Sequence, residues 1–432
     1  MSLQGLLKFI LLTLPFTNSV TLSVGFPLKA YEGAGFLALG VLMAGKGVRL
    51  GDSRRIVLLW WVFLFGSLLA SAWGLNEILS RDLSMLEWAH GRYDPLINTL
   101  FHYSYLAFDI GLMVLVLHVL ENRLLSLEVF CRWWTYGALL SVLYAVALNV
   151  VLAAGLSATL LLRFGETSFM DVAGISVART GPFEEGNYFG LYLLTSFVVA
   201  FYAGRRWPAP LFRWILPALL LGVVITASPA ALMGVGVLVL VALVVGGVSS
   251  PVRNGSIALG VLVLAALIKT GLFQTVVLDK FSLLFMGGVV DTRNVSLIIR
   301  LNESYHAWQM FLDFPWGVGM GNFGYFFSYY PDLYTWLETD FNNFKPIANN
   351  VYLEVLSEHG LGMFLLFLFL LYSKVSRLVR AREFLVTAGF LLVCVYFVAF
   401  PTFRLSFIWL FWAFAIYLGR PVVDIVQTEA GK

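Results

Sequence analysis

The chain has 432 residues, of which 60% are hydrophobic, 16% aromatic and only 12% charged, with a formal net charge of +3. This composition lies far outside the range of water-soluble globular proteins, so the bilayer is the solvent in which the chain folds. A nucleic-acid partner is not expected, because membrane orientation is sufficient to explain the basic clusters.

Apolar runs of membrane length recur along the whole sequence. About 20 helical residues cross a hydrocarbon core of roughly 30 Å. In chain order, we expect helices near residues 5–20, 30–45, 56–74, 97–120, 134–156, 187–203, 212–227, 229–247, 255–277, 350–372, 384–400 and 404–419. The first two are short, and Pro15 and Pro27 are positions at which they could break. The predicted fold is therefore all-α, a polytopic integral membrane protein with about 12 transmembrane helices in one membrane domain, residues 1–432.

Basic residues accumulate in every second loop and predict the orientation. Lys and Arg resist translocation and mark the cytoplasmic side. With the N-terminus inside, the cytoplasmic loops hold the basic clusters at 46–55, 123–132, 205–213 and 374–382. We therefore expect cytoplasmic N- and C-termini, and two long connections on the outer side, residues 157–186 and 278–349.

The second outer connection spans about 70 residues, and loops longer than about 15 residues are uncommon unless they are functional. We expect residues 295–311 to form a helix against the membrane surface. The run Gly319-Met-Gly-Asn-Phe-Gly324 matches the dinucleotide pattern GxGxxG, but it lacks the preceding strand and the βαβ unit of such a site. We interpret its glycines as a tight backbone passage that lets the loop fold onto the helices.

The first outer segment with candidate chemistry is Ala178-Arg-Thr-Gly-Pro-Phe-Glu-Glu-Gly-Asn-Tyr-Phe-Gly190. Arg179 could bind a lipid-linked phosphate through paired, charge-assisted hydrogen bonds that Lys cannot reproduce. The alternative is an interfacial arginine that pairs with Glu184 or Glu185.

Two further segments carry charged groups at helical spacing. Arg300 and Glu303 are one turn apart, so Arg300 either binds a ligand or is held by Glu303. Glu354 and Glu358 share one face at the start of the helix predicted at 350–372. A carboxylate there is either a partner of the helix dipole or a general base.

Charged residues inside predicted membrane helices suggest an alternative functional class, the transporters. Asp109 and Lys269 lie within predicted helices, where unpaired charges are costly, and they could pair with each other. Transporters place their binding groups near the midplane on broken helices, often with an internal repeat. The sequence shows no such repeat and concentrates its polar residues in the outer loops. A polysaccharide or lipid transporter is therefore a distant alternative to an enzyme that acts on lipid-linked substrates.

Three blocks resemble the O-antigen polymerase and O-antigen ligase superfamily: Arg-Thr-Gly-Pro-Phe-Glu-Glu-Gly-Asn-Tyr-Phe-Gly at 179–190, Pro-Trp-Gly-Val-Gly-Met-Gly-Asn-Phe at 315–323, and Asn-Val-Tyr-Leu-Glu-Val-Leu-Ser-Glu-His-Gly at 350–360. The likeness is strongest from about 170 to 372 and includes a long periplasmic loop before a late helix. The spacing from Arg179 to Gly190 is similar to the Arg-x10-Gly spacing of polymerase loops.

The resemblance implies a metal-independent, inverting glycosyltransferase without a cofactor, in the bacterial inner membrane with its active face in the periplasm. The implied donor is an undecaprenyl-diphosphate-linked glycan. A polymerase adds repeat units to another lipid-linked unit, as in O-antigen, capsule or exopolysaccharide synthesis, whereas a ligase passes the finished chain to lipid A-core. We expect a polymerase, with the ligase as the alternative. Membrane lipids and a chain-length regulator are further expected partners.

The resemblance also implies roles for individual residues. In the superfamily, arginines of the two outer loops grip the donor diphosphate, and here these are Arg179 and Arg300. Ligases have His-Asn before the Tyr-Leu-Glu run, where this chain has Asn349-Asn350. Asparagine cannot act as a base, so another residue would take that role, the candidates being Glu303, His306 and Glu354. The remaining residues expected to contact substrate are Glu184, Glu185, Asn187, Arg293, Asn349, Asn350 and Tyr352.

Overall fold

The computed structural model describes residues 2–19, 21–23, 27–45, 47–83, 94–163, 168–172, 175–207, 210–245, 295–333 and 346–420. Most of these residues are helical. In chain order the elements are α1 (Leu3–Thr13), β1 (Thr21–Ser23), β2 (Pro27–Lys29), α2 (Ala30–Ala44), α3 (Arg54–Ser80), α4 (Pro95–Glu121), α5 (Leu127–Ala153), a 3-10 turn (Ala158–Leu161), β3 (Phe169–Val172), β4 (Ile175–Ala178), α6 (Gly186–Arg206), α7 (Pro210–Thr226), α8 (Pro229–Val245), α11 (Val295–Asp313), α12 (Phe323–Phe327), α13 (Val351–Arg380), α14 (Phe384–Tyr396) and α15 (Ser406–Leu418).

The predicted helix pattern agrees with the structure at all eleven predicted positions that lie among the described residues. The predicted helix at 255–277 lies outside them, as do Lys269 and Arg293. The expected helix at 295–311 is present as α11. Several helices are longer than predicted, and α13 in particular continues to Arg380.

The first predicted helix, 5–20, requires a correction because α1 ends at Thr13. Pro15 follows almost at once, and proline has no N–H with which to continue the helical hydrogen bonds. The chain then turns into the antiparallel hairpin β1–β2, in which Thr21 pairs with Lys29. The antiparallel pair β3–β4 precedes α6. The fold is therefore mostly helical, consistent with the predicted all-α class, and the described residues add two short hairpins to it.

The helices have the length and surface of membrane helices. In the described part of the chain, five of them, α3, α4, α5, α6 and α13, are long and apolar enough to cross a membrane. On α3, the exposed fractions of Trp61, Phe65 and Trp73 are 46%, 62% and 50%. Such exposure is costly in water but not among lipid tails, which are as apolar as these side chains. The chain is a multi-pass membrane protein.

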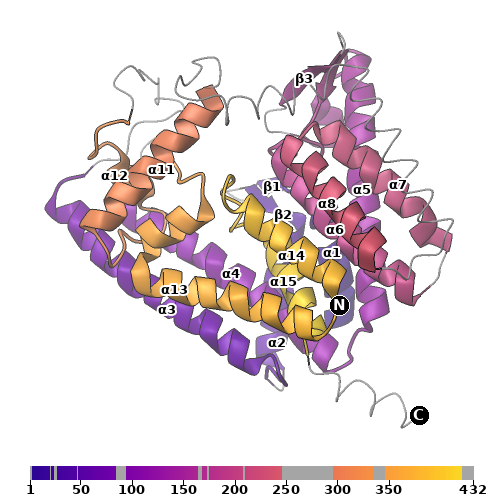
Figure 1. The fold of residues 1–432 in the computed structure, drawn as a ribbon, viewed down its shortest axis with the longest axis horizontal. Helices are drawn as coiled ribbons and strands as arrows, with labels where there is room; N and C mark the ends of the chain where they lie inside the picture. The colour runs from indigo at the N-terminus through magenta and orange to yellow at the C-terminus, as the bar shows by residue number, and fades with distance from the viewer. Residues whose placement is uncertain are drawn as a thin grey trace.

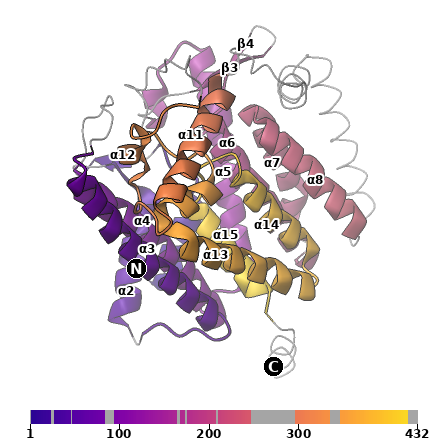
Figure 2. The ribbon, with the colours of Figure 1, turned by 60° about the vertical axis from the view of Figure 1, so that its left-hand side comes forward.

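The helices form two groups joined by the last two helices. Figures 1 and 2 show α3, α4 and α13 on one side and α5, α6, α7 and α8 on the other, with α14 and α15 between them. Where α3 meets α15, the ring of Trp60 stacks on Trp412 with centroids 5.1 Å apart and lies 4.8 Å from Trp409. This aromatic core fixes the last helix against α3, and with it the connection that precedes α15.

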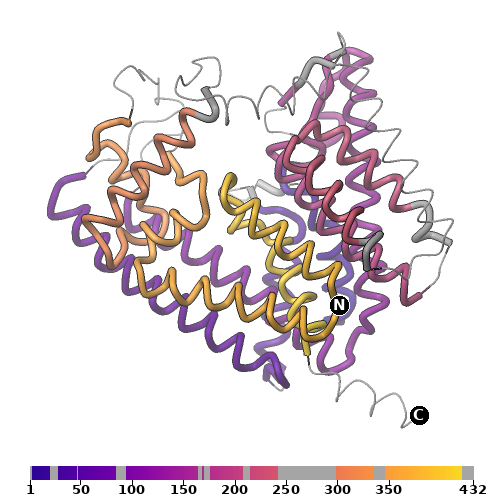
Figure 3. The backbone as a smooth tube through the Cα atoms, in the orientation of Figure 1, coloured from indigo at the N-terminus to yellow at the C-terminus, as the bar shows by residue number. Residues whose placement is uncertain are grey.

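One end of the molecule carries β3, β4, α11 and α12, and we call it the loop end (Figure 1). Helix α3 ends there, whereas α4, α6, α13 and α15 begin there. In Figure 3 the backbone from α11 to α12 runs beside the start of α13, which both helices contact. Arg54, Arg206 and Arg380 mark helix ends at the opposite end of the molecule.

The glycine-rich segment 315–322 crosses the first turns of α13 in direct backbone contact. The N–H groups of Val318 and Gly319 donate to the carbonyls of Ser357 and Glu358, at 2.8 and 2.9 Å. Gly319 has a φ of +91°, a conformation that side-chain-bearing residues rarely adopt. The segment is therefore a tight backbone passage onto the helices, as the sequence indicated, and not the opening of a dinucleotide-binding unit.

Candidate functional site

Arg179 stands at the entrance to α6, on a turn that another arginine holds in place. The guanidinium of Arg163, a buried residue, donates to the carbonyls of Gly181 and Phe183, at 2.6 and 3.1 Å. Gly181 has a φ of +52°, so the turn needs the conformational freedom of glycine. Arg163 was not among the predicted residues, and its structural role fixes the segment that presents Arg179.

The side chain of Arg179 passes close to the first residue of α6. A Cβ on Gly186 would lie only 2.6 Å from Nε of Arg179 and 2.9 Å from the carbonyl oxygen of Thr226. Glycine at this position thus makes room for the arginine. Further along α6, a Cβ on Gly190 would lie 2.6 Å from Cβ of Ala231. The spacing of eleven residues therefore joins Arg179, the expected phosphate ligand, to Gly190, which lets α6 pack closely against α8.

Arg179 is partly buried and forms no ion pair within the described part of the chain. Among the described residues its guanidinium has no hydrogen-bond or ion-pair partner, and Nε is buried. Burial lowers the pKa of Arg179, the charge of Glu185 raises it, and the charge of Arg300 lowers it further. Arg179 and Arg300 are therefore close enough to repel each other, although they come from different outer connections.

Arg300 reaches the same region from α11. Its guanidinium lies over the ring of Phe400, 4.6 Å from the centroid, in the connection between α14 and α15. This cation–π contact positions the group without neutralising it. Among the described residues Arg300 has no ion pair, so the predicted alternative of a simple Arg300–Glu303 pair is not formed. Two guanidinium groups that form no ion pair among the described residues thus lie near each other at the loop end, where the charges of Glu185 and Glu303 also act on them.

Glu303 lies one turn further along α11 and is 5% exposed. Its carboxylate accepts a hydrogen bond from the side-chain amide of Asn349 and another from the backbone N–H of Ile347. Burial raises the pKa of Glu303 to about 7, while these two donors and the charge of Arg300 act in the opposite direction. The predicted residues Glu303 and Asn349, 46 positions apart, are brought together.

His306 is buried and turned into the loop. Its Nδ1 lies 2.9 Å from the carbonyl oxygen of Phe327, and its Nε2 lies 3.3 Å from a carboxylate oxygen of Asp332. The imidazole also stacks on the ring of Phe327 with centroids 4.1 Å apart. Burial lowers the pKa of His306. Both ring nitrogens are engaged, so the structure gives His306 a role in holding α11 to the segment after α12.

A third arginine, Arg404, was not predicted as a site residue. It lies in the connection before α15 and donates to Glu354 at 2.9 Å and to Glu358 at 3.4 Å. It also contacts the ring of His102 on α4. Arg404 is a cation on the side opposite the basic loops, where basic residues are uncommon. This placement is the sequence signal by which Arg404 could have been found. Its charge is balanced by two carboxylates.

Glu358 also anchors the glycine-rich segment. Its carboxylate accepts from the N–H groups of Gly321 and Phe323, at 2.9 and 3.2 Å. Glu354 and Glu358, the carboxylates predicted at the start of α13, thus both form ion pairs with Arg404. Glu354 also lies in the first turn of that helix.

The other predicted substrate-contacting residues separate into two groups. Glu184 and Glu185 are exposed at the start of α6, next to Arg179. In contrast, Asn187 accepts from the hydroxyl of Ser228, Asn350 caps α13 and Tyr352 donates to the carbonyl of Cys394. The side chains of this second group are engaged in holding helices.

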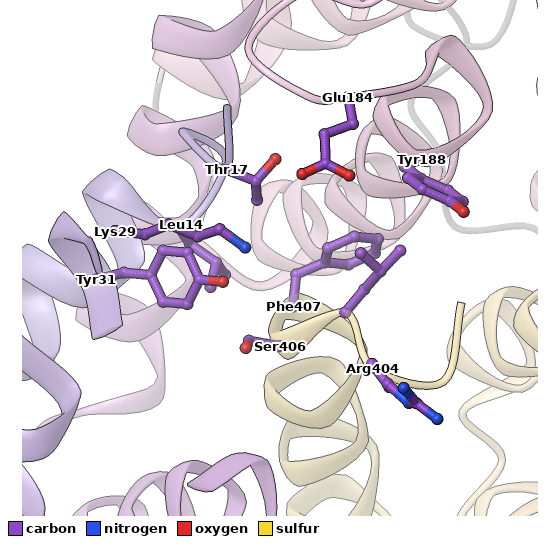
Figure 4. A pocket seen from close by; sticks show the side chains of 10 residues that line it. Leu14, Thr17, Lys29, Tyr31, Glu184, Tyr188, Arg404, Ser406 and Phe407 are labelled. Carbon is purple, nitrogen blue, oxygen red and sulfur yellow. The ribbon is translucent and has the colours of Figure 1, made fainter. Parts of the chain in front are cut away.

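A cavity of about 50 Å³ adjoins the arginine site. Thr17, Lys29 and Glu184 face one another across it, and the guanidinium of Arg404 points away from it (Figure 4). Tyr188 lines the cavity from α6. Charged groups of both signs, Lys29 and Glu184, therefore line the space between the start of α2 and the start of α6.

The arrangement is suited to a phosphate ester. Neighbouring guanidinium groups bind phosphate oxygens in pairs, and they stabilise negative charge that develops on a departing phosphate. Within the described ranges, no group of three or more His, Cys, Asp or Glu side chains could hold a metal ion. Arg179 and Arg300 bring two positive charges to this region.

Comparison with known families agrees with this chemistry. Residues 214–370 match the family model described as O-antigen ligase. The resemblance to the O-antigen polymerase and ligase superfamily is confirmed. The match supports a membrane enzyme of polysaccharide ligase or polymerase type, and it includes Arg300, Glu303, Asn349 and Glu354 but neither Arg179 nor Arg404. No curated protein matches the chain.

Proposed function

We propose that the chain is a glycosyltransferase that polymerises undecaprenyl-diphosphate-linked repeat units, as in O-antigen, capsule or exopolysaccharide synthesis. The observation that carries the proposal is the pair of guanidinium groups of Arg179 and Arg300 at the loop end, neither of which forms an ion pair among the described residues. A diphosphate is the anion that such a pair fits, because each guanidinium can engage one phosphate through two hydrogen bonds.

In the proposed reaction the two arginines hold the donor diphosphate and stabilise it as it leaves. An acceptor hydroxyl attacks the anomeric carbon from the opposite side, so a single displacement inverts the configuration. The cations take the electrostatic role that a metal ion has in other transferases.

The loop end is proposed to face the periplasm, with the chain in the inner membrane and both termini in the cytoplasm. Helix ends bearing Arg54, Arg206 and Arg380 gather at the opposite end, in keeping with the rule that basic residues remain inside. The proposed partners are the lipid-linked donor, a lipid-linked acceptor, membrane lipids and a chain-length regulator.

The O-antigen ligase reaction, with lipid A-core as acceptor, is the second candidate because the matched family model carries that description. The polymerase is favoured because Asn349 stands where ligases have histidine. Both reactions share the donor and the leaving group, so the arginine pair supports them equally.

The test is polysaccharide length in a deletion strain complemented with wild type, Arg179→Ala, Arg300→Ala or empty vector. Gels would resolve lipopolysaccharide and free polymer, and immunoblots would control for expression. Loss of long chains while single repeat units still reach the core supports the polymerase. Full-length chains that accumulate on undecaprenyl diphosphate support the ligase instead. Unchanged polymer in every strain would overturn glycosyl transfer.

A further inference from the structure

We propose that Glu303 is the general base that accepts the proton of the acceptor hydroxyl, and that Asn349 is the positioning residue that orients its carboxylate. This inference rests on the proposed glycosyl transfer and adds the group that activates the acceptor.

The position of Glu303 relative to Arg300 is the first argument. The two residues are three positions apart on α11 and therefore share a face of that helix. Arg300 in turn lies close to Arg179. A carboxylate on this face stands beside the place where the diphosphate and the anomeric carbon would lie, so it is in a position to meet an incoming hydroxyl.

The partners of the other candidate bases are the second argument. Both ring nitrogens of His306 are engaged with Phe327 and Asp332. Glu354 and Glu358 neutralise Arg404, and protonation of either would leave that cation short of a counter-charge. Glu303 instead is bound by neutral donors, the Asn349 amide and the Ile347 N–H. In the described part of the chain, Glu303 is the predicted candidate carboxylate whose protonation would break no ion pair.

The character of the carboxyl group is the third argument. A general base works best when its pKa lies near the working pH, because a large fraction of it is then ionised and it is still basic enough to accept a proton. Burial provides this for Glu303, whose pKa of about 7 is far above that of an exposed glutamate. The Asn349 hydrogen bond favours the ionised form and keeps the pKa from rising further.

The step balances as a single displacement. The carboxylate of Glu303 takes the proton of the acceptor hydroxyl as its oxygen forms a bond to the anomeric carbon. The bond from that carbon to the phosphate oxygen breaks, and its electron pair leaves with undecaprenyl diphosphate. The proton then passes from Glu303 to water, which restores the carboxylate for the next transfer.

The experiment uses membranes that contain the full-length protein and the lipid-linked glycan extracted from the deletion strain. Glu303→Gln keeps the size of the side chain and one acceptor oxygen for hydrogen bonds but cannot accept the proton. We expect transfer to fall about 100-fold or more, with retention of the extracted glycan by the purified variant unchanged. Glu77→Gln is the matched control, because Glu77 lies near the loop end but pairs only with Arg81. It should transfer at the wild-type rate.

The pH profile separates a base from a merely structural carboxylate. Wild-type transfer should be half-maximal near pH 7 and fall as the pH drops, because protonated Glu303 cannot act as a base. Asn349→Ala removes a donor that lowers the pKa of Glu303, so its half-maximal point should shift to higher pH.

The outcomes distinguish this inference from the proposed function. If wild type transfers nothing under any condition, glycosyl transfer itself fails. If wild type is active, Arg300→Ala is inactive and Glu303→Gln stays within about threefold of wild type, the base is another group and the inference is overturned. An unshifted profile in Asn349→Ala would overturn the role of Asn349.

Discussion

Arg300 and Arg404 are both arginines at the loop end, yet their surroundings differ in kind. Arg404 is surrounded by Glu354, Glu358 and His102, and its charge is balanced within the fold. Arg300 lies against the ring of Phe400 without an ion pair among the described residues, and its charge lowers the pKa of Arg179 by less than the charge of Glu185 raises it. Burying one cation without a counter-ion is costly, and keeping two together is costlier still.

In the proposed function, this difference separates a cation that stabilises the fold from the cations that bind the diphosphate. A balanced arginine stabilises the fold and gains nothing from an added anion. An unbalanced pair destabilises the empty protein slightly and gains from a bound dianion. Substitutions of the two kinds should therefore separate stability from activity.

The largest effect is expected for Arg404→Ala. Removal of Arg404 leaves the buried carboxylates of Glu354 and Glu358 without their cation, and loss of one partner of a buried pair costs about 3–5 kcal/mol. The midpoint of thermal unfolding in detergent, followed by size-exclusion chromatography, should fall strongly. Arg380→Ala is the control, because Arg380 bonds only to Ser376 of its own helix. Equal stability of the two variants would contradict the structural role of Arg404.

Arg179→Ala and Arg300→Ala are expected to act on transfer instead. Loss of one group that stabilises the departing charge costs about 100-fold in rate or more. The unfolding midpoint should stay close to the wild-type value, because neither arginine forms an ion pair among the described residues. Transfer in membranes and unfolding of the same preparations would be measured together. A variant that loses stability in parallel with activity would place that arginine in the same class as Arg404.

A smaller effect is expected for Arg179→Lys. The charge remains, but an ammonium group cannot form the planar pair of hydrogen bonds that guanidinium forms with phosphate. We expect about a tenfold loss of transfer, roughly 1.4 kcal/mol in the barrier. The rate at saturating extracted glycan provides the measurement. Full activity would mean that Arg179 acts as a point charge alone.

The helices were predictable because membrane length and apolar composition are local properties of the chain. Pro15 explains the main error in the early helices, since the run of apolar residues continues past the point where hydrogen bonding stops. Arg179 and Arg300 were singled out from the sequence by their place in the outer segments and by the resemblance to the superfamily, and the structure brings both to the loop end.

The partners of these residues were not predictable in the same way. Arg404 meets His102 across 302 positions and Glu354 across 50, and no local pattern connects them. Asn350 similarly looks like a ligand in sequence, yet it caps α13 by accepting from Tyr352 and Leu353. Side-chain pairing is decided by the packing of distant helices, which a single sequence does not display.

The position of Arg404 and Phe400 near the end of the chain has a consequence for biogenesis. Both lie in the connection before α15, so the contact of Arg404 with α13 and the contact of Phe400 with Arg300 form only when α15 enters the membrane. A chain into which α15 has not inserted would carry Arg300 without the ring that positions it. Insertion of α15 thus completes the surroundings of Arg300.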